Sequence, residues 1–241
     1  MKLLIIRHGD PDYAIDGLTE KGKREVELLA DRLCREDITA VYCSTLGRAK
    51  LTAQPTLDRL GMQATYCEWL REFSYCPVQP PYREKAGISW DQLPRYMAEH
   101  PELYSPTAWR ENPTWANSDV PAAYDAVCRE LDAMLATHGL ERRGTQYTVT
   151  APSHDTVVLV CHYGLSCVLL SHLMNCSPFS LWQHACMAPT SVTTFYTEER
   201  EAGIASLRCA GLGDISHLYA AGEPAAFSAR FCECFTDDTR H

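Results

Sequence analysis

The sequence has no apolar stretch that approaches the roughly 18 residues of a membrane-spanning helix. The first apolar run, Leu3 to Ile6, is too short for the hydrophobic part of a signal peptide, and Arg7 ends it without a small-residue cleavage site. We therefore expect a cytoplasmic protein with no membrane partner, in which this run forms a buried strand.

Metal-binding and disulfide patterns are also lacking. None of the 12 cysteines stands in a C-x-x-C pair, and 12 cysteines in 241 residues are too few for a disulfide scaffold. Neither the cysteine spacing nor the histidine spacing matches a structural zinc site. The sequence therefore predicts no metal and no cofactor, and the cysteines inside apolar segments are expected to pack as small hydrophobic residues.

Positive charge is scarce. The chain has 22 lysines and arginines against 31 aspartates and glutamates, which gives a formal net charge of −9. This balance argues against a nucleic-acid partner bound through a general basic surface. A small anionic ligand is compatible with it, provided that a local cluster of positive side chains meets the anion.

Strand and helix patterns alternate along the chain. The first helix follows Thr19, a good N-cap, and has Val26, Leu29 and Leu33 on one apolar face. Because strands that alternate with helices form parallel sheets covered on both sides, we predict an α/β fold: a three-layer, doubly wound, mostly parallel central sheet with helices on both faces. The expected elements are strands at 2–6, 40–43, 65–69 and 156–161, helices at 19–35, 46–60, 165–174 and from 121 onward, and an antiparallel pair at the sheet edge, 191–197 and 204–208.

Residues 73–120 break this alternation. They contain seven prolines and three of the five tryptophans, Trp90, Trp109 and Trp115. A structureless loop of that length is uncommon inside a compact domain. We therefore expect one domain over 1–241, in which 73–120 is a lid-like insertion that caps the active site. The last twenty residues show no pattern that predicts a helix or a strand.

Histidines follow two of the predicted strands. Arg7-His8-Gly9 and His162-Tyr163-Gly164 each stand at the carboxyl end of a buried strand, where open α/β sheets bind their ligands. Arg48 lies at the start of the second helix, and both a guanidinium and a helix N-terminus favour an anion. Glu72 follows the third strand and could give a proton to a leaving oxygen. Together these residues predict a phosphate site.

Five motifs resemble those of the histidine phosphatase superfamily, also called the phosphoglycerate mutase-like family. The resemblance covers residues 2 to about 197 in the family's order, apart from the insertion. Each motif alone is weak, whereas five in series at family-like spacing are specific. They are Arg7-His8-Gly9, Gly17 to Gly22, Ser44 to Arg48 with Thr52-Ala53, Leu70-x-Glu72, and His162-x-Gly164.

This resemblance implies a role for each matching residue. His8 corresponds to the nucleophile that becomes phosphorylated, and Arg7, Arg48 and His162 correspond to the groups that hold the phosphoryl oxygens. Glu72 corresponds to the general acid that protonates the leaving alcohol and then activates water. His8, Glu72 and His162 are thus the expected catalytic residues, and the family needs no metal. The expected partner is a small-molecule phosphate ester.

The same pocket can support hydrolysis or mutase transfer. Where mutases of the family carry a small hydroxyl residue and an asparagine after the R-H-G motif, this chain has Pro11 and Ala14. Phe73 to Pro77 also replaces the mutase stretch that grips a phosphoglycerate. We therefore favour a phosphomonoesterase that hydrolyses a small phosphorylated metabolite through a phosphohistidine. The alternatives are phosphoglycerate mutase-type phosphoryl transfer and a non-catalytic phosphate-binding regulatory module.

Asp10 bears on the activity of this site. A carboxylate that pointed toward His8 would raise the pKa of the imidazole and favour its protonated, non-nucleophilic form. We therefore expect the Asp10 side chain to point outward.

Overall fold

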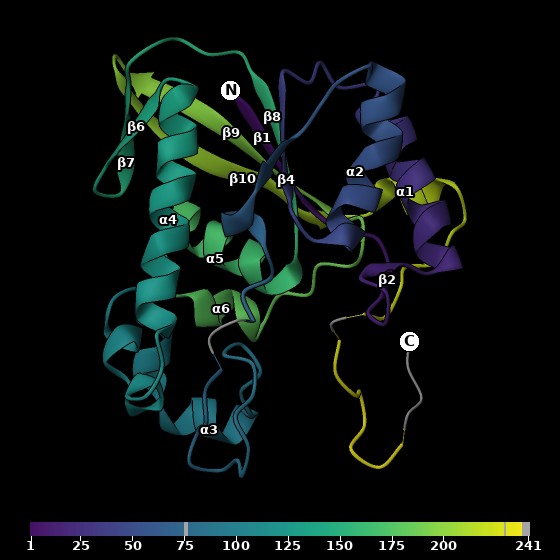
Figure 1. Ribbon diagram of the computed structural model, residues 1–241. Coiled ribbons are helices and arrows are strands. Elements are labelled where there is room, and N and C mark those ends of the chain that lie inside the picture. The colour runs from purple at the N-terminus through teal and green to yellow at the C-terminus, as the bar shows by residue number, and fades with distance from the viewer. Residues whose placement is uncertain (75–76, 229, 238–241) are drawn as a thin grey trace.

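An eight-stranded mixed sheet forms the centre of the computed structural model, which describes residues 1–74, 77–228 and 230–237. Tyr75 and Cys76 of the predicted cap, and residues 229 and 238–241 of the patternless C-terminal stretch, lie outside the described part. The strand order is β5-β4-β8-β1-β9-β10-β7-β6 (Figure 1). The strands are β1 (Lys2–Arg7), β4 (Ala40–Ser44), β5 (Thr65–Cys67), β6 (Leu140–Arg143), β7 (Gln146–Val149), β8 (Thr156–Cys161), β9 (Val192–Glu201) and β10 (Ile204–Asp214); β2 (Pro11–Asp12) and β3 (Gly17–Leu18) form a separate ladder.

The half of the sheet that carries the strand-end histidines is parallel. Strand β1 pairs parallel with β8, β8 with β4, and β4 with β5, whereas β9 pairs antiparallel with the other side of β1. The remaining strands are antiparallel. The mostly parallel core that the sequence predicts is confirmed, and it places the carboxyl ends of β1, β4 and β8 at one edge.

Helices cover both faces of this sheet (Figure 1). Strand β1 shows why, because its side chains alternate: Leu4 and Ile6 join a buried cluster with α1 and α2, whereas Leu3 and Ile5 join a second cluster with α4 and α5. A strand that is apolar at every position must be covered twice. The helices are α1 (Glu20–Leu33), α2 (Gly47–Leu60), α3 (Pro94–Glu99), α4 (Val120–Thr137), α5 (Tyr163–Met174), α6 (Pro178–Trp182) and α7 (Ser216–Ala220).

Helix ends follow the local sequence signals. Thr19 caps α1, and its hydroxyl accepts a hydrogen bond from the Gly22 amide. Helix α2 ends at Gly61, whose φ of 63° lies in the left-handed region that glycine adopts without strain. No helix in the described part of the chain is long and apolar enough to cross a membrane.

The sheet edge differs from the prediction. Strands β9 and β10 form the expected antiparallel pair, but the hairpin of β6 and β7 adds to β10, so that β6 is the edge strand. The sequence did not predict this hairpin, because three of the four residues of Leu140–Arg143 are charged and show no alternation of apolar and polar positions. The third strand is also shorter than predicted, since Glu68–Leu70 forms a 3-10 turn.

The insertion is built from short helical pieces and buried aromatic rings. Besides α3 it contains 3-10 turns, and its fully buried Trp109 packs against Trp115, whose indole nitrogen donates to the Trp109 carbonyl at 2.7 Å. Figure 1 shows it at the end of the molecule opposite the N-terminus. The 3-10 turns are η1 (Glu68–Leu70), η2 (Pro101–Tyr104), η3 (Ala108–Glu111) and η4 (Pro113–Trp115).

Candidate active site

The register of β1 and β8 brings the two strand-end histidines together. Arg7 is paired with Cys161, and the His8 amide donates to the Cys161 carbonyl at 2.9 Å, so that His8 and His162 emerge side by side. Their ring centroids are 5.0 Å apart, and both side chains are buried, with 1% and 0% of their surface exposed. The sequence placed the two imidazoles at one sheet edge, and the structure places them in contact there.

His8 is oriented and electrically neutral. Its Nδ1 lies 2.7 Å from the Gly9 carbonyl oxygen, which can only accept a hydrogen bond. The proton is therefore on Nδ1, and the lone pair of Nε2 is free. Burial and then the positive charges of Arg7 and Arg48 lower the pKa of His8 to about 3. At neutral pH the imidazole is thus uncharged, with its one ring proton on Nδ1, and Nε2 is able to act as a nucleophile.

His162 presents a donor toward the same region. Its Nε2 lies 2.8 Å from the Ser44 hydroxyl, which itself accepts from the Leu46 amide. The Ser44 hydroxyl proton can therefore go to Nε2, and in that arrangement the ring hydrogen of neutral His162 is on Nδ1. Burial, the neighbouring His8 and the nearby arginines lower the pKa of His162 well below its usual value.

Arg7 and Arg48 make this edge locally positive in an acidic protein. Arg7 NH1 donates to the Met187 carbonyl at 2.6 Å, and Arg48 NH1 donates to Asp16 Oδ1. Asp16 also accepts from the Gly47 amide at 2.6 Å, which fixes the first turn of α2 under the Arg48 side chain. Asp16 was not predicted from the sequence, because its hydrogen bond to α2 spans 31 residues of chain.

Three buried N–H groups lack a partner at this edge. Arg7 Nε, Arg48 Nε and His162 Nδ1 make no hydrogen bond with any residue that the structure describes. Buried donors are almost always satisfied, and each one left without an acceptor costs about 1–3 kcal/mol. Three of them beside a neutral imidazole form a cradle for an anion.

Glu72 lies at the N-terminus of α5, next to the same strand ends. Its Oε1 accepts from the Phe73 amide at 2.8 Å and from the Leu165 amide at 3.0 Å. Burial raises the pKa of Glu72, although the Phe73, Leu165 and Gly164 amides and the charge of Arg7 act in the opposite direction. A carboxyl with a raised pKa is suited to donate a proton near neutral pH.

Trp90 brings the insertion to this carboxyl. A Cβ added to Gly164 would lie 2.4 Å from Trp90 Nε1 and 2.8 Å from Glu72 Oε1, so both atoms border the same glycine. The indole N–H is buried and has no acceptor within the described residues. The Trp90 ring also packs edge-on against Tyr163, with centroids 5.3 Å apart. Gly164 is therefore needed for this close approach.

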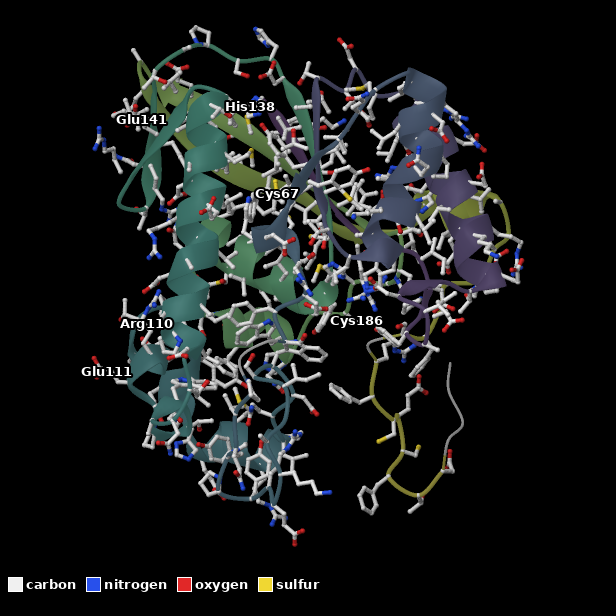
Figure 2. The ribbon with its side chains drawn as sticks, in the orientation of Figure 1. Cys67, Arg110, Glu111, His138, Glu141 and Cys186 are labelled. Carbon is white, nitrogen blue, oxygen red and sulfur yellow. The ribbon has the colours of Figure 1, made fainter. Side chains whose placement is uncertain are left out.

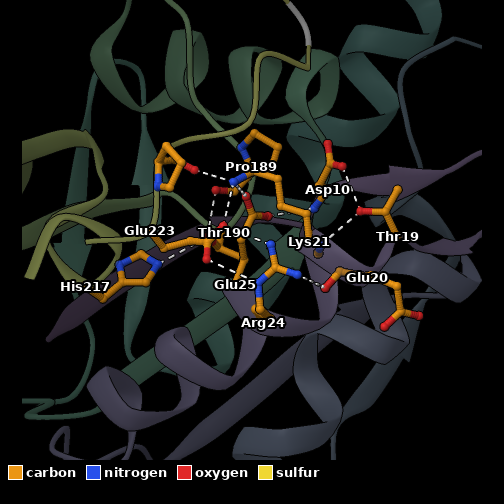
Figure 3. A network of polar contacts seen from close by, with 12 residues as sticks. Asp10, Thr19, Glu20, Lys21, Arg24, Glu25, Pro189, Thr190, His217 and Glu223 are labelled. Carbon is orange, nitrogen blue, oxygen red and sulfur yellow. Dashed lines mark hydrogen bonds and ion pairs between the residues drawn. The ribbon is translucent and has the colours of Figure 1, made fainter. Parts of the chain in front are cut away.

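The Asp10 side chain binds the start of α1. Its Oδ2 accepts from the Thr19 hydroxyl at 2.8 Å, and its amide donates to Glu25 at 2.9 Å (Figure 3). The carboxylate is thus engaged by a helix cap, as the outward orientation requires.

Two residues from late in the chain also reach this edge. Ser228 contacts the Arg7 guanidinium through both its carbonyl and its hydroxyl oxygen. Cys186 lies at the same end of the sheet, whereas His138 lies at the opposite end (Figure 2). Ser228 could not be found from the sequence, because the stretch around it has no periodic pattern and contacts Arg7 across 221 residues.

Comparisons with known proteins agree with this geometry. The model of the histidine phosphatase superfamily (branch 1) matches residues 3–210. A protein of Schizosaccharomyces pombe named as a probable phosphatase is 25% identical over 238 residues, which cover 90% of this chain and 95% of that protein. Phosphoserine phosphatase 1 of Hydrogenobacter thermophilus is 24% identical and covers 86% of this chain and 92% of its own length.

Solved structures share the fold. A mutant phosphoserine phosphatase from Entamoeba histolytica in complex with phosphoserine has a TM-score of 0.59 at 17% identity, with 90% of this chain and 98% of that chain covered. A mycobacterial glucosyl-3-phosphoglycerate phosphatase in complex with VO3 has a TM-score of 0.54 at 24% identity, with 88% and 98% covered. The relatives of this chain indicate a phosphatase hydrolase. Because the family model matches residues 3–210, this chain belongs to the histidine phosphatase superfamily (branch 1).

Proposed function

We propose that the protein is a phosphomonoesterase that hydrolyses a small phosphorylated metabolite through a phosphohistidine at His8. The observation that carries the proposal is the set of three buried N–H groups, on Arg7, Arg48 and His162, that lack a protein acceptor among the described residues beside a neutral His8. A tetrahedral dianion offers acceptors to all three at once, and guanidinium groups match phosphoryl oxygens especially well.

In the first step, His8 Nε2 attacks phosphorus while the P–O bond to the alcohol breaks. The N–H groups of Arg7, Arg48 and His162 meet the charge on the equatorial oxygens. Glu72 gives the proton on Oε2 to the departing oxygen and becomes a carboxylate. The alcohol leaves, and the phosphoryl group stays on the imidazole.

In the second step, the Glu72 carboxylate takes a proton from water as the water oxygen attacks phosphorus. The P–N bond breaks, inorganic phosphate forms, and His8 returns to its neutral state with the proton still on Nδ1. Glu72 is again protonated. The cycle consumes one ester and one water, and it is complete without a metal.

Residues 73–120 are the proposed cap. Trp90 carries the insertion to Glu72 and Gly164, which places part of 73–120 beside the groups that would meet the leaving alcohol. The named activities of the relatives, on phosphoserine and on glucosyl-3-phosphoglycerate, suggest a small hydroxylated metabolite as the substrate class. Phosphoryl transfer of the mutase type stays the alternative, and a non-catalytic phosphate-binding module is the second.

The test is p-nitrophenyl phosphate hydrolysis with EDTA present. His8→Ala should lower turnover by about a thousandfold or more, because the covalent route is lost. His154→Ala, which removes an exposed histidine, should have no effect. An acid-labile phosphoenzyme should be detected in the unaltered protein and not in His8→Ala.

Three results separate the alternatives. Turnover that persists in His8→Ala would rule out the histidine mechanism. Loss of activity in EDTA would rule out metal independence. With 3-phosphoglycerate, release of an isomeric ester instead of inorganic phosphate would identify a mutase, and phosphate binding without turnover of any ester would identify the binding module.

A further inference from the structure

The chain after α7 crosses back over the phosphate site. We name residues 223–228 the C-terminal strap. Its first residue, Glu223, pairs with Lys21 at 2.8 Å and with Arg24 at 3.2 Å, both on α1. The Pro224 carbonyl accepts from the same Lys21 side chain. Figure 3 shows Glu223 beside both of these cations.

The other end of the strap binds Arg7. Arg7 NH1 donates to the Ser228 carbonyl at 2.9 Å, and Arg7 NH2 donates to the Ser228 hydroxyl oxygen at 3.2 Å. NH1 is also bound by the Met187 carbonyl. Both terminal nitrogens are therefore occupied, and Nε is the nitrogen of this guanidinium without an acceptor in the described chain.

The position of the Ser228 hydroxyl matters for phosphate. The Nε and NH2 groups of arginine form a planar fork that can grip two oxygens of one phosphoryl group. Ser228 Oγ occupies the NH2 half of that fork. Nε has no acceptor within the described residues, but a phosphoryl group gains the bidentate grip only when Ser228 leaves.

We propose that Ser228 is a specificity-determining residue that competes with the substrate phosphoryl group for Arg7. This inference rests on the proposed function of the site. A phosphate ester whose organic part makes further contacts displaces the strap, whereas inorganic phosphate and small esters have only their charge with which to do so. The strap thereby disfavours small anions and weakens product inhibition.

The strengths of the contacts fit such a competitor. Ser228 offers neutral acceptors to the Arg7 guanidinium, whereas the oxygens of a phosphate dianion add the attraction between opposite charges to the same hydrogen bonds. A phosphate dianion can therefore take the fork from Ser228. The ion pairs of Glu223 hold the strap nearby, so that Ser228 returns when the anion leaves. The apparent affinity for phosphate equals the intrinsic affinity multiplied by the fraction of molecules in which the fork is free.

The competition predicts opposite effects of Ser228→Ala and Ser228→Asp on the affinity for phosphate. Titration calorimetry of the full-length protein with inorganic phosphate measures them. Ser228→Ala frees NH2 and should lower the Kd by about threefold, and Glu223→Gln, which loosens the strap, should lower it by a similar factor. Ser228→Asp places a carboxylate on Arg7 and should raise the Kd by about tenfold. Thr236→Ala, exposed further along the same C-terminal segment, is the matched control and should change nothing.

Kinetics give a second readout on the same proteins. In Ser228→Ala, KM for p-nitrophenyl phosphate should fall while kcat stays within about twofold, because the strap opposes binding and takes no part in chemistry. Thermal unfolding of each variant checks that the fold is retained. A Ser228→Ala protein that binds phosphate equally well or more weakly, or a Ser228→Asp protein that binds it equally well, overturns the inference.

Arg7→Ala separates this inference from the proposed function. If Arg7→Ala keeps its affinity for phosphate, the proposed phosphate site is wrong and the strap has no role in it. If Arg7→Ala loses affinity while the Ser228 variants do not respond, the site stands and only the competition fails. If the phosphate site and the competition are both correct, Ser228→Ala should not change the affinity for phosphate in the Arg7→Ala background, because the strap acts through Arg7.

Discussion

Replacement of Glu72 by glutamine preserves the shape of the side chain while removing its proton. The amide oxygen of the new side chain can still accept from the Phe73 and Leu165 amides, which now bind Oε1 at 2.8 and 3.0 Å. The amide nitrogen takes the place of Oε2, the oxygen to which the structure offers no N–H from these two residues. We therefore expect Glu72→Gln to fold normally and to lack the acid and base that both chemical steps use.

The loss should differ between the two steps. General acid–base catalysis contributes on the order of 10²- to 10⁴-fold to a proton-transfer step. Nitrophenolate is a stable anion and needs little protonation, so phosphorylation of His8 by p-nitrophenyl phosphate should be slowed only slightly in Glu72→Gln. Attack of water on the phosphohistidine still needs the base, and it should be slowed by the full 10²- to 10⁴-fold.

The assay is rapid-mixing absorbance of nitrophenolate. Glu72→Gln should release a burst of about one nitrophenolate per chain and then turn over slowly. With an alkyl phosphate, whose leaving group does need the proton, the burst should disappear. Glu68→Gln, which alters an exposed carboxylate paired with Arg71, is the control. Unchanged steady-state turnover in Glu72→Gln would refute the role assigned to this carboxyl, and so would equal slowing of the burst and the steady state.

Three further predictions concern the surroundings of the site. Trp90→Phe removes the indole N–H beside Glu72 and should lower kcat for alkyl phosphates by about tenfold. The control, Trp109→Phe, removes a buried N–H within the insertion core and should change only the unfolding midpoint. Equal losses of kcat in the two variants would show that packing, and not the Trp90 N–H, is responsible. Gly164→Ala puts a methyl group 2.4 Å from Trp90 Nε1 and should cost about 10²-fold in kcat, and normal kcat would contradict the close approach. Burial raises the pKa of Glu25 from 4.5 to about 7. The contribution of Glu25 to the free energy of unfolding is therefore complete below pH 4.5 and is lost as the pH rises to about 7. In Glu25→Gln, the free energy of unfolding from denaturant titrations should lack about 3 kcal/mol of this decline.

Much of the fold was accessible from the sequence because burial leaves a direct trace there. Strands β1 and β8 are apolar at nearly every position, which predicts strands covered on both faces. Thr19 predicts the start of α1, because its hydroxyl is a good N-cap. The sequence also placed His8 and His162 at the carboxyl ends of two buried strands, where open α/β sheets bind their ligands. That these two strands are neighbours, with Arg7 paired with Cys161, had to come from the structure.

What the sequence could not predict depends on polar contacts between distant residues. The β6–β7 hairpin buries Leu140 and Tyr147 but is otherwise polar, so it carries no alternating signal. Asp16 and Ser228 reach Arg48 and Arg7 through single side chains on irregular backbone. Such contacts add no periodicity, because they satisfy one donor each instead of covering an apolar face. The sequence pattern therefore predicted the positions of Arg7 and Arg48 but not the residues that accept their hydrogen bonds.

In the proposed mechanism the same arginines hold the substrate and lower the pKa of the nucleophile, so a bound dianion should also act on His8. The charges of Arg7 and Arg48 lower the pKa of His8, and a phosphoryl group that neutralises them acts in the opposite direction. Burial, however, is the largest cause of the lowered pKa, and a substrate that closes the pocket keeps the imidazole out of water. We therefore expect the His8 imidazole to stay neutral in the substrate complex, where the arginine charges are engaged by the phosphoryl group that the imidazole attacks.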